Sequence, residues 1–195
     1  MSQNIEIEFK NLLTKEEYLQ IKNHFGIKDE DLFKQENHYF DTKNFLLKKN
    51  KAALRIRKKQ NFYELTLKQP HPDGLLETNR VLTAQESDTI FKTGVIKDEQ
   101  IIQLLAQMDI PAHDIQYFGS LTTIRAEKEI GNGLLVLDHS FYLNEEDFEL
   151  EYEVTNRQKG QADFEQILQK FQILKRPTKN KVQRFYDKKY AQQNK

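Results

Sequence analysis

The segment Ile5-Glu6-Ile7-Glu8-Phe9-Lys10 alternates strictly between apolar and charged side chains. Successive side chains of a β-strand point to opposite faces of the sheet. The three apolar residues therefore share one face, and Glu6, Glu8 and Lys10 share the other. The segment predicts a strand that has one apolar face and one fully charged face.

The same alternation recurs further along the chain, and the charges on these faces are largely sorted by sign. The charged faces comprise Arg55 and Arg57; Glu64, Thr66 and Lys68; and Glu149, Glu151 and Glu153. For any single segment, an ordinary half-buried strand with a solvated outer face is the simpler interpretation. Solvated faces usually mix both signs, however, because like charges at neighbouring positions repel. The sorting therefore favours helices that cover the apolar faces, with the charged faces turned toward one another.

Periodicity and turn residues predict the remaining elements. Thr14 with Glu17, and Thr83 with Glu86, form capping-box patterns that open helices. Further helices are expected over residues 101–108, 164–171 and 181–190. The expected strands cover residues 5–10, 38–41, 53–58, 62–68, 75–82, 116–130, 134–143 and 148–154.

This order of elements predicts an α+β fold. About eight strands whose charged faces meet predict a closed eight-stranded antiparallel β-barrel, a tunnel with a polar lumen and helices packed outside. No linker rich in Gly, Ser or Pro divides the chain. We therefore expect a single domain over residues 1–190 and a polar tail over residues 191–195.

Composition narrows the classes of partner. The 30 basic and 30 acidic residues balance, which argues against a nucleic-acid partner bound through overall charge. Cysteine is absent, so disulfides, thiolate chemistry and cysteine-ligated zinc are excluded. No stretch approaches the roughly 18 apolar residues of a membrane span. We expect a soluble, cytoplasmic protein without a membrane partner, and a homodimer is left open.

Acidic and basic faces in one lumen suit a particular ligand. Carboxylates without Cys or His partners suit hard cations such as Mg²⁺ or Mn²⁺, which keep several positions for water and phosphate oxygens. Arg and Lys side chains suit the phosphate oxygens themselves. The pattern therefore predicts a polyphosphate bound together with a divalent metal.

The charged segments resemble, in order, the motifs of the CYTH domain family, also called the triphosphate tunnel metalloenzymes. EIEFK at residues 6–10 resembles the ExExK signature of that family. KNKVQR at residues 179–184 resembles the late KSKYxR motif, with Asn180 and Val182 in place of Ser and Tyr. Between them lie YFDT (39–42), LRIR (54–57), LTLK (65–68), Glu77, Arg125, LD (137–138) and EYEV (151–154). The resemblance covers about residues 5–186.

The resemblance implies a tunnel enzyme that hydrolyses triphosphates with a divalent metal. The expected metal ligands are Glu6, Glu8, Asp138, Glu151 and Glu153, with Glu149/Glu151 as an alternative to the Glu151/Glu153 pair. The expected substrate-binding residues are Lys10, Arg55, Arg57, Lys68, Arg125, Lys179, Lys181 and Arg184. The expected catalytic residues are Glu6, Glu8 and Glu77, and Glu6 or Glu77 is expected to orient the attacking water.

Shared fold does not fix the activity. The family includes inorganic, thiamine and RNA triphosphatases as well as class IV adenylyl cyclases. We expect hydrolysis of inorganic tripolyphosphate or of a small organic or nucleoside triphosphate. The alternatives are a class IV-like adenylyl cyclase, for which the sequence has no identifiable base-reading motif, and a non-catalytic sensor that binds a triphosphate or nucleotide.

Overall fold

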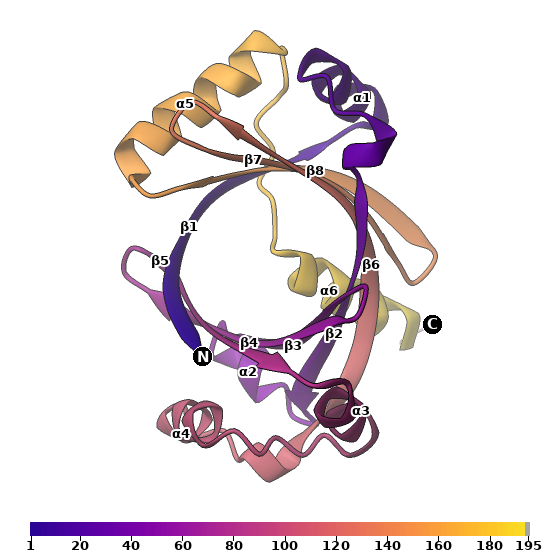
Figure 1. Ribbon diagram of the computed structural model, residues 1–195, viewed down its shortest axis with the longest axis vertical. Coiled ribbons are helices and arrows are strands. Elements are labelled where there is room, and N and C mark those ends of the chain that lie inside the picture. The colour runs from indigo at the N-terminus through magenta and orange to yellow at the C-terminus, as the bar shows by residue number, and fades with distance from the viewer. Residues whose placement is uncertain (194–195) are drawn as a thin grey trace. The chain divides into compact units, whose positions relative to one another are not determined.

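The computed structural model describes residues 1–193, and its strands form a closed antiparallel barrel in the order β1-β5-β4-β3-β2-β6-β7-β8 (Figure 1). The predicted fold class is thereby confirmed. The strands are β1 (Ser2–Leu13), β2 (Phe33–Thr42), β3 (Ala53–Lys59), β4 (Phe62–His71), β5 (Gly74–Leu82), β6 (Ile115–Ile130), β7 (Gly133–Tyr142) and β8 (Glu145–Val154). The helices are α1 (Lys15–His24), α2 (Leu46–Lys49), α3 (Ala84–Thr93), α4 (Glu99–Gln107), α5 (Arg157–Lys170) and α6 (Lys181–Gln193), with 3-10 turns at Asp29–Asp31 and Ala112–Asp114.

Both predicted capping boxes are formed. The backbone N–H of Glu17 donates to the Thr14 hydroxyl, and the Glu17 carboxylate accepts from the Thr14 N–H at 2.7 Å, which opens α1. Thr83 and Glu86 make the same reciprocal pair at the start of α3. Two N–H groups that would otherwise lack a partner are satisfied in each helix, so these local sequences fix where the helices begin.

The structure extends or adds elements that periodicity did not reveal. α2 was not predicted, because four residues are too few to show a helical period. α6 continues through Gln193, so residues 191–193 of the expected tail are helical, and residues 194–195 lie outside the described residues. β4 includes Pro70 and ends at His71, so the turn between β4 and β5 consists of Pro72 and Asp73 only.

The chain divides into two compact units. The first comprises residues 1–5 and 36–121. In this unit α2 packs near β3, and α3 packs near β4 and β5. Leu54, Leu65, Leu67 and Ile101 are fully or almost fully buried in its core. Within each of these strands, alternate residues therefore form an apolar face under the helices and a polar face on the opposite side.

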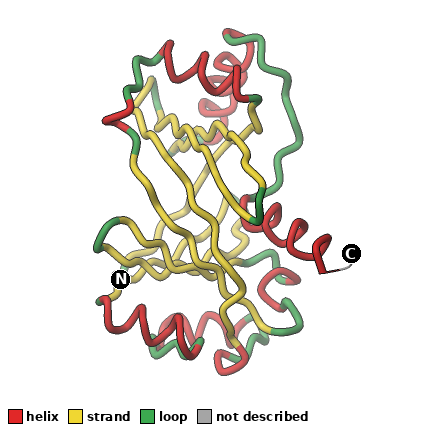
Figure 2. Tube along the Cα trace, turned by 90° about the vertical axis from the view of Figure 1, so that its right-hand side faces the viewer, coloured by secondary structure: helices red, strands yellow, loops and turns green. Residues whose placement is uncertain are grey.

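The second unit comprises residues 6–35 and 122–195, of which the structure describes those through 193. α1 and α5 pack against β8 (Figure 1). Leu150 and Tyr152 of β8 join Phe164 and Ile21 in its core. Figure 2 shows the helices of this unit in red beside its yellow strands. The alternation of apolar and acidic residues in β8 thus places Leu150 and Tyr152 in the core and the acidic residues on the opposite face.

The YFDT segment has a structural task. The Asp41 carboxylate accepts from the backbone N–H groups of Thr42 at 2.7 Å, Leu47 at 2.9 Å and Lys48 at 3.2 Å. These bonds satisfy the start of α2, and Asp41 is only 1% exposed. The role of Asp41 in this motif is therefore structural, because it fixes the start of α2 in the first unit.

No helix among the described residues is both long enough and apolar enough to cross a membrane.

Gly160 offers a test of how closely α5 packs on β8. A Cβ at this position would lie 2.5 Å from Cγ2 and 2.9 Å from Cβ of Val154. We expect Gly160→Ala to lower the free energy of unfolding by about 1–3 kcal/mol, because overpacking outweighs the better helix propensity of alanine. Gln166→Ala, at an exposed position of the same helix, is the control and should leave the urea midpoint nearly unchanged. An equal or higher midpoint for Gly160→Ala would contradict the close packing.

Candidate functional site

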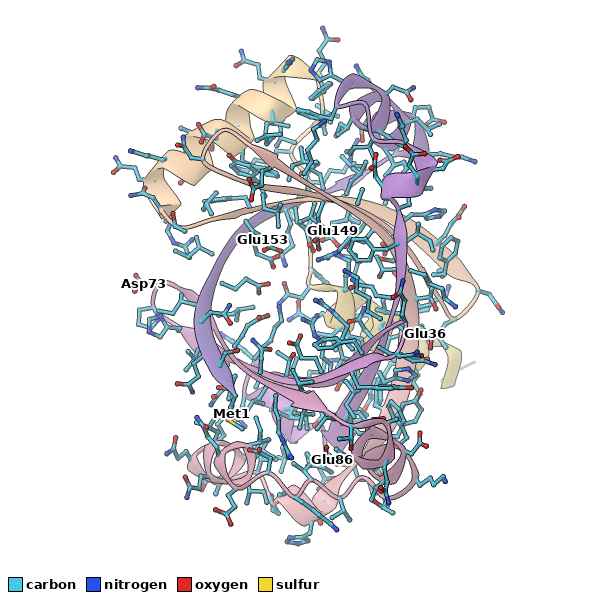
Figure 3. All side chains as sticks on the ribbon, in the orientation of Figure 1. Met1, Glu36, Asp73, Glu86, Glu149 and Glu153 are labelled. Atoms are coloured by element: carbon cyan, nitrogen blue, oxygen red, sulfur yellow. The ribbon has the colours of Figure 1, made fainter. Side chains whose placement is uncertain are left out.

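The acidic face of β8 is the centre of the charged residues in the second unit. Glu149 and Glu153 lie on the side of the β8 ribbon away from α1 and α5 (Figure 3). In the ladder with β1, Glu8 is opposite Glu153 and Lys10 is opposite Glu151. Strand pairing therefore brings the ExExK segment and the acidic run of β8 together.

Lys181 is held by three carboxylates. Asp138, Glu149 and Glu151 each offer an oxygen, and these oxygens all lie within 4.8 Å of one another. The Lys181 ammonium lies 2.8 Å from Asp138 and 2.5 Å from Glu151, and it also contacts Glu149. Burial opposes the charged form of Lys181, but these carboxylates outweigh it and raise its pKa well above the ordinary range. We name Asp138, Glu149 and Glu151 the acidic trio.

Arg125 supplies a second buried cation to the same carboxylates. Its Nε and Nη2 donate to the two oxygens of Asp138 at 2.7 and 2.6 Å, and Nη2 also donates to Glu151 at 2.8 Å. Bidentate pairing of this kind fixes the planes of both groups. Burial disfavours ionised Glu151, yet Lys181 and Arg125 outweigh that cost and hold its pKa well below the usual range.

Glu6, Glu8 and Glu153 form an acidic group with less compensation. Burial raises the pKa of Glu153 to about 7, and nearby Glu151, Glu6 and Glu8 add to the rise against the opposing effect of Arg125. A carboxylate whose ionisation is disfavoured by like charges would be stabilised by an added cation. These donors are all carboxylate oxygens, so Mg²⁺ or Mn²⁺ fits them better than a softer metal.

The late basic segment reaches β8 through some of its residues. Arg184 donates to Asp147 at 2.9 Å and to Glu149 at 3.0 Å. Lys179, in contrast, is 67% exposed and pairs with Asp187 of α6 at 2.7 Å. The structure thus brings Lys181 and Arg184 to the acidic residues of β8, and it pairs Lys179 with Asp187 of α6, the helix that follows it.

The first unit carries its own charged group. The Lys68 ammonium lies 2.5 Å from the Glu77 carboxylate, and Arg55 lies 3.9 Å from it. Burial opposes ionisation of Glu77, but Lys68, Arg55 and Arg57 together hold its pKa at about 2. Arg57 donates to the side-chain oxygen of Asn37 at 3.2 Å. Every predicted site residue of this unit therefore lies on one polar face.

Asp147 was missing from the predicted site, and Glu149 was predicted only as an alternative metal ligand. Glu149 is fully buried against Lys181 and Arg184. Its position in the alternation of Glu149, Glu151 and Glu153 was the available signal, and the sequence left open which of these carboxylates form the acidic pair. Asp147 continues that alternation toward the start of β8, but its pairing with Arg184 depends on where α6 lies.

Comparison with known proteins gives a consistent result. The family model described as CYTH domain matches residues 4–186. A Bacillus subtilis (strain 168) protein named "Putative triphosphatase YjbK" is 50% identical over 191 residues, which cover 97% of this chain and 98% of that protein. A solved structure of a "putative adenylate cyclase" from Bacillus halodurans is 42% identical, with a TM-score of 0.92 over 95% of this chain and 100% of the other. A "putative adenylyl cyclase" structure from Hippeastrum shares the fold at 20% identity, with a TM-score of 0.77 over 94% and 96% of the two chains.

Removal of the Lys181 charge tests the arrangement around the acidic trio. Lys181→Met leaves three buried carboxylates with less compensation. We expect it to lower the unfolding free energy by about 3–5 kcal/mol without divalent metal. Millimolar Mn²⁺ should raise the melting temperature of this variant more than that of the wild type, because the metal ion then meets no competing ammonium.

Lys179→Met is the matched control, since it removes an exposed ammonium from the same segment. Its melting temperature and its response to Mn²⁺ should follow the wild type. A Lys181→Met protein that is as stable as the wild type in chelator would contradict the role of Lys181 as the counter-ion of the acidic trio.

Acid titration tests the charged group of the first unit. The pKa of Glu77 falls from 4.5 to about 2 on folding. Its ionisation therefore stabilises the folded protein above about pH 4.5, and that contribution is lost as the pH falls toward 2. In Glu77→Gln, the free energy of unfolding should be lower at pH 7 and should fall less steeply between pH 4.5 and 2. Equal slopes for the two proteins in urea titrations would contradict the assignment.

Proposed function

Because the chain belongs to the CYTH domain family, we propose that it hydrolyses the terminal phosphoanhydride bond of a triphosphate with Mg²⁺ or Mn²⁺ bound to its carboxylates. The observation that carries this proposal is the incompletely compensated acidic group of Glu6, Glu8 and Glu153 beside the fixed cations Arg125 and Lys181. Such a site suits a ligand that brings both positive and negative charge, which a metal-bound triphosphate does.

The proposed metal ligands are the carboxylates of β1, β7 and β8 in the second unit, namely Glu6, Glu8, Asp138, Glu149, Glu151 and Glu153. When bound, the metal would neutralise phosphate oxygens and activate the terminal phosphorus toward water. Asp138, Glu149 and Glu151 already hold cationic side chains. We therefore assign the principal metal site to Glu6, Glu8 and Glu153, with Glu151 shared between the metal and Lys181.

Cationic side chains would hold the phosphate oxygens. In the second unit these are Lys10, Arg125, Lys181 and Arg184, and in the first unit Arg55, Arg57 and Lys68. Phosphoryl transfer depends mostly on positioning and on neutralisation of charge, so cations that are already held in place within each unit supply much of what the reaction needs. We leave Lys179 out of this set, because its side chain is exposed and paired with Asp187.

Two carboxylates are candidates for orienting the attacking water. Lys68 and Arg55 hold Glu77 ionised, with a pKa of about 2. A carboxylate with so low a pKa is a weak base, although it still accepts a hydrogen bond. We therefore propose that Glu77 orients the attacking water through a hydrogen bond, with Glu6 as the alternative candidate for this role.

The identity of the triphosphate is part of the proposal. The 50% identical Bacillus subtilis protein is named "Putative triphosphatase YjbK". The 42% identical Bacillus halodurans structure is described as a "putative adenylate cyclase". We propose inorganic tripolyphosphate or a small organic triphosphate as substrate, and keep ATP cyclisation as the second candidate because of that name.

The first experiment measures phosphate release from tripolyphosphate, ATP and thiamine triphosphate, each with Mg²⁺, Mn²⁺ or chelator. We expect release that requires the metal. Glu6→Gln and Glu8→Gln should each lower kcat/KM by at least about a hundredfold, because each removes a metal ligand. Glu146→Gln is the matched control, since it changes an exposed carboxylate of β8 that pairs with His139, and its activity should match the wild type.

Other outcomes would redirect the proposal. Cyclic AMP formed from ATP without free phosphate would establish the cyclase. Tight, metal-dependent binding of tripolyphosphate without turnover would establish a sensor. Full activity in chelator, or in both Glu6→Gln and Glu8→Gln, would refute the metal-dependent mechanism.

A further inference from the structure

Lys10 is the one cation of the ExExK segment, and a neutral side chain holds it. Its ammonium donates to Oδ1 of Asn180 at 2.6 Å and also contacts the Glu8 carboxylate. Asn180 comes from a segment 170 residues further along the chain. Asn180 occupies the position where the motif that this segment resembles has a serine. The contact with Lys10 is therefore made by a side chain in which this sequence departs from the motif.

Asn180 also begins α6. Its carbonyl oxygen accepts from the N–H of Arg184 at 3.1 Å, which is the first bond of the helix. Its own N–H donates to the side-chain oxygen of Gln183 at 3.3 Å. Asn180 is therefore the N-cap residue, where an asparagine side chain normally accepts from a backbone N–H of the first turn. Here the Asn180 side-chain oxygen accepts from Lys10 instead.

A neutral partner matters because Lys10 lies among carboxylates. Glu8 contacts it directly, and Glu151 lies opposite it in the β1–β8 ladder. An acceptor with a negative charge would add to the compensation of the ammonium. An amide oxygen fixes its position and leaves its charge unchanged. The contact therefore holds the ammonium in place while keeping its attraction for an anion.

We propose that Asn180 is a positioning residue that holds the Lys10 ammonium for the phosphate oxygens of the substrate. The proposal rests on the proposed function, since it assigns Lys10 to phosphate binding. Asn180 acts through Lys10 and has no step of its own in the chemistry. Its loss should therefore weaken substrate binding and leave the rate of the bound complex nearly unchanged.

The test is a double-mutant cycle with Asn180→Ala and Lys10→Met, with KM and kcat measured for tripolyphosphate. We expect Asn180→Ala to raise KM about threefold to tenfold, the range for the net loss of one ordinary hydrogen bond, because Asn180 acts only through Lys10, and we expect little change in kcat. In the Lys10→Met background the same substitution should change KM by less than about twofold. Equal effects of Asn180→Ala in both backgrounds would overturn the proposal.

Two further variants separate positioning from helix capping. Asn180→Asp keeps a good N-cap residue but places a carboxylate beside Lys10, so KM should rise although the melting temperature does not fall. Gln183→Ala weakens the same helix start without touching Lys10, so KM should stay at the wild-type value. An unchanged KM in Asn180→Asp, or a rise in Gln183→Ala equal to that in Asn180→Ala, would show a capping role only and overturn the proposal.

Failure of the proposed function can be told apart from failure of this inference. If tripolyphosphate binds without turnover, its dissociation constant from calorimetry replaces KM in the same cycle. If tripolyphosphate does not bind at all, phosphate binding by Lys10 is refuted and the proposal falls with it. A non-additive change in the urea midpoint of the four proteins would then still establish the Asn180–Lys10 contact as structural.

Discussion

One constraint determines how the charged residues of the second unit are arranged. Buried carboxylates need positively charged partners beside them. Glu149 and Asp138 are fully buried, and Glu151 is 6% exposed. Removing such groups from water costs several kcal/mol for each ion unless partners compensate. Lys181 and Arg125 provide that compensation through short contacts. The position of the segment that carries Lys181 is therefore tied to the charges of β7 and β8.

The same constraint connects stability to the proposed activity. A cation that neutralises a buried carboxylate is already desolvated and oriented, so it needs little reorganisation to meet a phosphate oxygen. Glu153 shows the opposite case, a carboxylate whose pKa of about 7 reports incomplete compensation. The carboxylates that have close cationic partners thus hold Lys181 and Arg125 in place, while the incompletely compensated ones are those we propose to bind the metal ion. Both kinds of residue occur on one face of β8.

Local sequence predicted the elements well where the physical signal was local. Thr14 with Glu17 fixed the start of α1, because the capping bonds lie within four residues. Strict alternation in β8 predicted which residues face the core, whereas in β1 Phe9 packs against the core but Ile5 is 43% exposed. α2 was missed, since its start depends on Asp41 accepting from backbone N–H groups up to seven residues away. The single-domain interpretation of residues 1–190 stays a prediction.

The sequence by itself determined the closed barrel, the sign of the charge on each strand face and the family of the chain, because alternation and motif order are properties of neighbouring residues. Only the tertiary structure decided which charges meet. Glu149 joined Asp138 because β7 and β8 pair in one register. Lys10 met Asn180 because the segment before α6 returns to β1. Such contacts depend on the reach of side chains between strands and helices far apart in the chain, which no local pattern records.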